Sequence, residues 1–173
     1  VPRWDLVKLQ HYATMAVQFS RGCPFDCEFC DIVVMNGRVP RTKTPAQLLA
    51  ELDTLCALGW KDMVFIVDDN FIGNKKFVKK LLTELEAWCQ RRDYPFYFTT
   101  EASMNLADDD ELLEMMKRCE FRFVFMGIET PDPDLLAVTQ KKMNSMKPIV
   151  ERIHHVYEHG ISISAGFILG FDS

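Results

Sequence analysis

The residues best suited to do chemistry in this chain are three cysteines within one short stretch, Arg21–Cys30. Cys23, Cys27 and Cys30 form a Cys-x3-Cys-x2-Cys array, and thiolates are strong ligands for soft metals. Three thiolates can hold a metal site, but they cannot complete a four-thiolate one. The other three cysteines stand singly among leucines and methionines, where small buried hydrophobic side chains are expected: Cys56, Cys89 and Cys119.

Three kinds of site use clustered cysteines. Structural zinc takes four ligands, and no fourth cysteine or histidine lies nearby, since His11 and Cys56 are the nearest in sequence. A redox Cys-x-x-Cys pair would use Cys27 and Cys30 and would leave Cys23 without a role. A cubane iron–sulfur cluster held by three thiolates leaves its fourth iron open. That iron can bind an amine and a carboxylate, and S-adenosylmethionine carries both at its methionyl end.

The bulk composition is that of an ordinary globular domain. The 173 residues are 48% hydrophobic and 26% charged, with a formal net charge of −5, whereas a nucleic-acid surface needs a basic stripe. The longest apolar run, around Met63–Val67, is far shorter than the ~20 residues of a membrane span, and no secretion signal is visible. We therefore expect no nucleic-acid partner, no transmembrane segment and a cytoplasmic location.

Short apolar runs alternate with amphipathic segments along the chain. A helix should begin at Thr44, which is followed by proline and then by Gln47 in a capping-box pattern. Further helices are expected from Asn74, from Asp108 with Glu111 as its capping box, over 133–138, and over 146–158. Strands are expected over 14–19, 63–67, 96–99, 122–126 and 162–169, and residues 31–43, with Gly37 and Pro40, are expected to be loop.

This alternation predicts a parallel α/β sheet with the helices outside. Five strands are too few for a closed eight-stranded barrel. We therefore expect an open, partial (β/α) barrel that is truncated at its C-terminus. Because the sequence starts at Val1 without a methionine, we also expect it to be part of a longer chain.

Polar or glycine residues follow every predicted strand. They are the cysteine loop, Asp68–Asp69–Asn70, Glu101, Glu129, and Gly170 with Asp172. The carboxyl ends of parallel strands meet at one edge of the sheet, where ligands bind in such folds. The sequence therefore predicts one shared site at this edge.

The histidines at the end of the 146–158 helix give a weaker signal. His155 and His159 have the i, i+4 spacing that permits metal binding, but no Glu-x-x-His pattern surrounds them. The end of a helix also favours exposed histidines near its negative pole. We expect His154, His155 and His159 to be ordinary surface side chains.

The chain resembles the radical S-adenosylmethionine superfamily in its cysteine array, with aromatic Phe29 before the last cysteine. Within that superfamily it is similar to the cobalamin-binding branch that includes the hopanoid methylases, and the resemblance covers essentially all 173 residues. Four stretches carry it: Arg21–Asp31, Val67–Gly73, Gly127–Pro131 and Gly166–Asp172. The resemblance implies that residues 1–173 are a radical domain fragment of about five βα units, without the cobalamin-binding domain and the C-terminal region.

The resemblance also implies roles for individual residues. Cys23, Cys27 and Cys30 would ligate a [4Fe–4S] cluster, and Phe29 would lie beside the adenine of S-adenosylmethionine. The remaining residues would bind the rest of that cofactor. Asp68, Asp69 and Asn70 occupy the place of the family's Gly-Gly-Glu-like motif, and Glu101 and Glu129 match positions that bind the ribose hydroxyls or the methionyl amine. Lys141 or Lys142 would bind the methionyl carboxylate, and Gly166, Ile168 and Gly170 would pack on the adenine, with Asp172 where relatives carry a glutamate.

The implied function is reductive cleavage of S-adenosylmethionine to a 5′-deoxyadenosyl radical that abstracts hydrogen. In the full-length protein, cobalamin would then support methylation of an unactivated carbon. The implied partners are a small-molecule substrate, with lipid-like molecules included, and an electron donor such as a flavodoxin or ferredoxin. The fragment alone could be inactive. The alternative is an α/β binding module that holds zinc or no metal and performs no radical chemistry.

Overall fold

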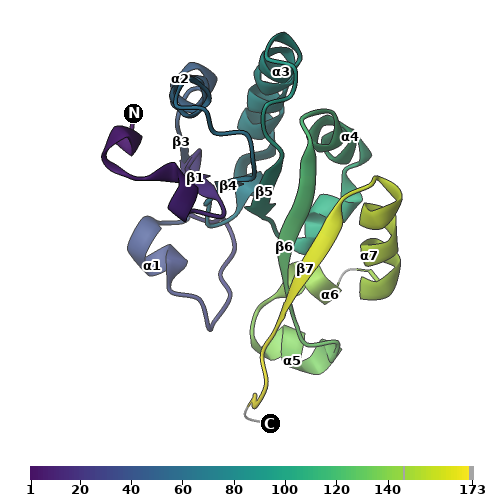
Figure 1. Ribbon diagram of the computed structural model, residues 1–173. Coiled ribbons are helices and arrows are strands. Elements are labelled where there is room, and N and C mark those ends of the chain that lie inside the picture. The colour runs from purple at the N-terminus through teal and green to yellow at the C-terminus, as the bar shows by residue number, and fades with distance from the viewer. Residues whose placement is uncertain (146, 172–173) are drawn as a thin grey trace.

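The computed structural model describes residues 1–145 and 147–171. Its centre is a parallel sheet of five strands in the order β1-β4-β5-β6-β7 (Figure 1). The strands are β1 (Met15–Val17), β4 (Val64–Ile66), β5 (Phe98–Glu101), β6 (Phe121–Glu129) and β7 (Ser162–Phe167). The described strands form an open sheet, as expected for a partial barrel, because β1 and β7 are its two edges.

Helices α2 (Pro45–Ala57), α3 (Lys75–Arg91), α4 (Asp110–Arg118) and α7 (Ile149–Glu158) cover the outside of the sheet (Figure 1). The short helices α1 (Ile32–Asn36), α5 (Pro133–Val138) and α6 (Lys142–Ser145) belong to the loops after the strands. The described residues also form four 3-10 turns: Trp4–Leu6, Leu9–His11, Phe71–Asn74 and Met104–Asp108. None of the helices in the described part of the chain has the length and apolar character needed to span a membrane.

The core contains an aromatic floor, a row of four packed rings from Phe19, Phe71, Phe98 and Phe121. The Phe71 ring lies 5.4 Å from that of Phe121 and 6.3 Å from that of Phe19, and the Phe121 ring lies 5.3 Å from that of Phe98. All four side chains are buried. Such ring pairs add stabilisation beyond the area that they bury. The floor links β4, β5 and β6 to the chain that leaves β1.

Two local expectations were wrong. The cap of α4 is Asp109, whose side chain accepts from the Leu112 backbone N–H, because Asp108 is held instead by Arg152 and Lys147. Residues 31–43 are not plain loop, since they contain α1 and the strand β3 (Arg41–Thr42). β3 pairs antiparallel with β2 (Ser20–Arg21), and the resulting hairpin encloses the cysteine loop.

The expected start of α2 is confirmed. The Thr44 side chain accepts from the Gln47 backbone N–H, and the Gln47 side chain accepts from the Thr44 backbone N–H. The first backbone N–H groups of a helix have no hydrogen-bond acceptor within the helix, and this capping box supplies one.

We predict that Thr44→Ala lowers the free energy of unfolding by ~1 kcal/mol, because the helix loses its N-cap acceptor. Urea unfolding of the chain measures this change. Thr54→Ala is the matched control, since the Thr54 hydroxyl only donates to the Ala50 carbonyl inside the same helix. An equal loss for both variants would contradict the capping role.

Candidate functional site

A cavity of about 180 Å³ opens at the carboxyl edge of the sheet. It brings together nine of the residues that the sequence assigned to a site: Cys23, Cys27, Phe29, Cys30, Asp69, Asn70, Glu101, Glu129 and Lys141. The wall also includes six residues that the sequence analysis did not single out: Phe25, Ala102, Ser103, Phe125, Gly127 and Met143. Apart from Phe25 they follow β5 or belong to the β6–α6 region, so their positions depend on the three-dimensional fold rather than on any motif.

The cysteine loop is held at its start by hydrogen bonds from two consecutive backbone N–H groups. Gly22 has φ of +103°, and a Cβ there would lie 2.8 Å from the Gly37 carbonyl oxygen, so the turn requires glycine. The Gly22 N–H donates to the Asp69 carboxylate at 2.6 Å, and the Cys23 N–H donates to the Gly37 carbonyl at 3.2 Å. Because Asp69 follows β4, it ties the loop to the neighbouring strand.

The three thiols share one partly buried environment. Burial raises the pKa of the Cys27 thiol, while the Lys141 ammonium lowers it and the nearby Cys30 and Cys23 thiols raise it. A set of thiolates at this position therefore needs a positive charge to stabilise it, and a metal centre provides one. Asn70 adds a weaker contact, since its Nδ2 lies 3.7 Å from the Cys23 sulfur.

The spacing of the thiols does not favour one shared metal ion. Four thiolates around zinc, at Zn–S of about 2.3 Å, would lie roughly 3.8 Å apart. Among the described residues, only Asp110, His155 and His159 form a group whose ligand atoms are close enough for a single ion. The cysteines are not such a group, and no histidine or fourth cysteine lines their cavity.

A buried ion pair forms the opposite wall of the cavity. Lys141 and Glu129 are each 9% exposed, and the Lys141 ammonium contacts the Glu129 carboxylate. The same ammonium lies 5.5 Å from the centre of the Phe29 ring, within cation–π range. Of the two lysines that the sequence left open, Lys141 lines the cavity and Lys142 is exposed.

The chain around this ion pair is built to make room for it. Gly127 leaves this room, because a Cβ there would clash with Glu129 Oε1 and lie 2.6 Å from Lys141 Nζ, so both side chains of the pair would have to shift. Glu129 itself has φ of +64°, a conformation that L-residues rarely adopt. The Asn144 side chain donates to the carbonyls of Gly127 and Ile128 at 3.0 Å each and fixes this bend.

Two carboxylates and an amide form the wall between the cysteines and the ion pair. Burial raises the pKa of Glu101, and the charge of Asp69 adds to that shift. The Asn70 Nδ2 donates to the Ser103 hydroxyl at 3.1 Å, and the Ser103 backbone N–H donates to Asn70 Oδ1 at 3.2 Å. Acceptors at this place suit a ligand that carries hydroxyl or ammonium donors.

Four other residues from the sequence prediction do not line the cavity. Asp68 turns away from it and accepts from the Phe19 N–H, the Ser20 N–H and the Ser20 hydroxyl, at 2.7, 2.8 and 2.6 Å. Its contribution is therefore structural, because it joins the end of β4 to the chain after β1. Gly166, Ile168 and Gly170 lie on or just after the edge strand β7, and they are not among the cavity's lining residues. Asp172 lies outside the described residues.

Gly166 nevertheless affects the wall of the cavity. A Cβ on Gly166 would lie 2.8 Å from the Phe125 ring, so the glycine leaves room for that ring to lie across β7. Phe125 is one of the residues that line the cavity. Gly166 therefore acts through Phe125 rather than by its own contact.

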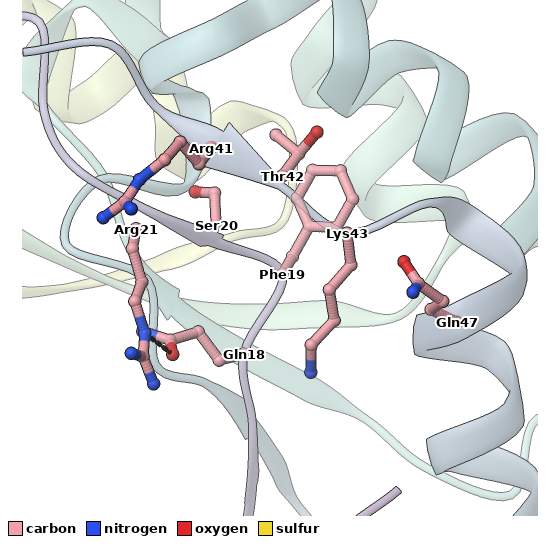
Figure 2. Close-up of a pocket in the computed structure, with 8 residues that line it drawn as sticks. All are labelled: Gln18, Phe19, Ser20, Arg21, Arg41, Thr42, Lys43 and Gln47. Atoms are coloured by element: carbon pink, nitrogen blue, oxygen red, sulfur yellow. Dashed lines mark hydrogen bonds between the residues drawn. The ribbon is translucent and has the colours of Figure 1, made fainter.

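A larger cavity, about 460 Å³, lies beside the β2–β3 hairpin and is basic (Figure 2). Its three cations are Arg21, Arg41 and Lys43. Arg21 donates to the Gln18 side chain, Arg41 donates to the Asn36 carbonyl at 3.3 Å, and Lys43 contacts Glu51 at 2.5 Å, so all three cations already have partners. The cavity holds no thiol or carboxylate, and we therefore assign the chemistry to the smaller cavity.

Comparison with known proteins gives matches over nearly the whole chain. The family model "Radical SAM superfamily" matches residues 17–173. An uncharacterized methyltransferase of Synechocystis is 56% identical over 99% of this chain and 32% of its own length, and the hopanoid C-2 methylase of Rhodopseudomonas palustris is 42% identical over 100% and 33%. The chain thus spans about a third of the length of these relatives.

Among solved structures, the radical S-adenosylmethionine methyltransferase TsrM of Kitasatospora setae, with cobalamin and a [4Fe–4S] cluster bound, superposes with a TM-score of 0.77. It is 21% identical, over 91% of this chain and 30% of its own. At this level of identity, the likeness shows the fold alone.

Asp68 makes the free energy of unfolding depend on pH. Burial raises its pKa to about 6 against the opposing hydrogen bonds from Ser20 and Phe19, whereas an unfolded aspartate titrates near ~3.9. Folding therefore favours the protonated form, so this contribution to stability is complete below pH ~4 and is lost as the pH rises through about 6.

We predict that the difference in unfolding free energy between the native chain and Asp68→Asn falls by roughly 1–3 kcal/mol from pH 4 to pH 7. Urea unfolding at a series of pH values measures it. Asp31→Asn is the control, because Asp31 is exposed and makes no side-chain cap to α1. A pH-independent difference for Asp68→Asn would show that its carboxyl titrates normally.

Proposed function

Because this chain belongs to the radical SAM superfamily, we propose that Cys23, Cys27 and Cys30 bind a [4Fe–4S] cluster. We propose further that the cavity beside them binds S-adenosylmethionine. The observation that carries this proposal is the convergence of three thiols and one buried ion pair on a single cavity. A structural zinc site would need neither the wide spacing of the thiols nor the charged wall that faces them.

The donor set fits such a cluster. Three thiolates from one loop supply three of the four protein ligands that a cubane cluster can take. The remaining iron is then free to bind an external ligand. The Lys141 ammonium lowers the pKa of Cys27, so this lysine also helps to keep the loop in the thiolate form that binds iron.

The Glu129–Lys141 pair matches the charges of an α-amino acid. The methionyl end of S-adenosylmethionine carries one ammonium and one carboxylate, and the pair offers one carboxylate and one ammonium. Binding would exchange the internal pair for two pairs with the ligand, so neither buried charge is left without a partner. Lys141 then holds the carboxylate, and Glu129 holds the ammonium or a ribose hydroxyl.

The rest of the cavity suits the nucleoside part of the ligand. Phe29 and Phe125 supply flat apolar surfaces for an adenine ring, and Asp69, Asn70 and Glu101 supply polar groups for the ribose or the ammonium. The absence of a side chain at Gly166 leaves the space that the Phe125 ring occupies. Ile168 and Gly170 stay predicted adenine contacts, made from the strand edge. The apolar rings also exclude water from the ligand's sulfonium, which protects reactive species from side reactions.

When bound, the cluster and S-adenosylmethionine supply one-electron reductive cleavage to methionine and a 5′-deoxyadenosyl radical, which abstracts hydrogen. We infer from the named methylases among the relatives that the full-length protein uses cobalamin to methylate an unactivated carbon of a small molecule, lipid-like substrates included. Residues 1–173 would be its radical domain, and cobalamin would bind a part of the protein that this chain does not cover. A cytoplasmic flavodoxin or ferredoxin would supply the electron.

We predict that anaerobic reconstitution with iron and sulfide gives the brown absorbance of a cubane cluster in the native chain. Cys27→Ala should remove most of it, because two thiolates cannot hold the cluster. Cys56→Ala is the matched control, since Cys56 is half-buried on α2 and far from the loop in sequence. Tight stoichiometric zinc binding without iron uptake would instead favour the binding-module alternative.

We predict that Lys141→Met weakens binding of S-adenosylmethionine to the cluster-loaded protein by about 10- to 100-fold, the equivalent of one charge-assisted hydrogen bond of ~1.5–3 kcal/mol. Equilibrium dialysis measures it. Lys142→Met should bind normally, because that lysine is exposed. The double variant Lys141→Met with Glu129→Gln avoids an unpaired buried carboxylate, and normal binding by it would disprove the role of the pair.

A further inference from the structure

The outer helices α4 and α7 carry a second set of metal-ligand side chains. Asp110 and Glu114 are one turn apart on α4, and His155 and His159 are one turn apart at the end of α7, so each pair shares a helix face. His155 Nε2 lies 2.8 Å from Asp110 Oδ1, and His159 Nε2 lies 3.6 Å from Glu114 Oε1. The two imidazole rings are 4.8 Å apart between centroids. Two imidazoles and two carboxylates therefore face one another across the groove between the helices.

The orientation of His159 directs its Nε2 at the Glu114 carboxylate, and in the neutral ring that nitrogen has no hydrogen to donate. His159 Nδ1 lies 2.9 Å from the His155 backbone oxygen. A carbonyl can only accept, so Nδ1 carries the hydrogen, and Nε2 of the neutral ring presents its lone pair to the Glu114 carboxylate. Two acceptors then face each other, and the His159 side chain is only 13% exposed. A cation between them would satisfy both, and a backbone acceptor on the other ring nitrogen is the usual support for a metal-binding histidine.

The distances are close to those of a single-ion site. The ligand atoms of Asp110, His155 and His159 all lie within 4.8 Å of one another. Ligands at about 2.0–2.2 Å from a tetrahedral zinc ion lie roughly 3.4 Å apart, so small side-chain rotations suffice. The Asp110 and Glu114 side chains are 77% and 47% exposed, which leaves them free to make these rotations.

We propose that Asp110, Glu114, His155 and His159 bind one divalent transition-metal ion of the zinc class. Nitrogen and oxygen donors without a thiol suit Zn²⁺ and its neighbours Co²⁺, Ni²⁺ and Cu²⁺, rather than the cluster chemistry of the cysteine loop. The ion would bind side chains from both helices and so cross-link α7 to α4. Since α7 leads directly into the edge strand β7, this cross-link would hold the last βα unit against the sheet. This site lies outside the cavity that holds the cysteines and does not depend on its function.

Titration with ZnCl₂ tests the proposal in cluster-loaded protein, in which the three loop cysteines are already occupied. Calorimetry at mildly alkaline pH, where the imidazoles are neutral, should show one zinc equivalent in the native protein. His159→Ala should weaken binding at least ~10-fold, and so should His155→Ala. His154→Ala is the matched control, because His154 is exposed on the same helix, and its affinity should be unchanged.

Two further measurements distinguish a loss of metal binding from a loss of folding. Glu114→Gln should also weaken zinc binding, although it removes no buried packing. Co²⁺ bound at this site should lack the sulfur-to-metal charge-transfer absorption that thiolate ligation produces. Zinc affinity that is the same in the native protein, His155→Ala and His159→Ala would overturn the proposal, as would a Co²⁺ spectrum with thiolate bands that the histidine variants leave unchanged.

Discussion

The buried ion pair between Glu129 and Lys141 is the interaction on which the candidate site depends most. Two charges in a poorly solvated position are tolerable only when each has a partner, because an unpaired one is strongly destabilising. Three features of the fold allow the two side chains to pair. Gly127 has no side chain that would clash with them, Glu129 has a positive φ, and Asn144 donates two hydrogen bonds to the neighbouring backbone. The pair lines the same small cavity as the thiols, which gives the cavity both signs of charge next to the cysteine loop.

The sequence could predict the parts of this fold that rest on local patterns. The apolar run at Met63–Val67 contains β4, and the Thr44–Gln47 signature forms the start of α2. The three cysteines, Glu101 and Glu129 meet at one edge because all five strands are parallel, and such strands bring their carboxyl ends together. These predictions needed only periodicity, capping chemistry and the order of the elements.

The predictions that failed depended on contacts between distant residues. Asp108 and Asp109 are equally good caps by type, and only the Arg152 and Lys147 side chains, which hold Asp108, decide between them. Asp68 looks like a ligand at a strand end, yet its carboxylate is taken by backbone donors from Phe19 and Ser20. The sequence also does not show that Asp110 and Glu114 lie opposite His155 and His159. A side chain's chemistry can be read from its type, but its direction depends on the packing of the whole fold.

The central claim is that three thiolates hold a cluster whose open iron binds the amino acid end of S-adenosylmethionine. The most direct measurement is the electron paramagnetic resonance spectrum of the reduced, cluster-loaded protein, recorded with and without S-adenosylmethionine labelled with ¹⁵N or ¹⁷O on its methionyl group. The account predicts a changed signal with hyperfine coupling to the labelled amine or carboxylate. A cluster signal that S-adenosylmethionine leaves unchanged, without coupling to either label, would contradict it.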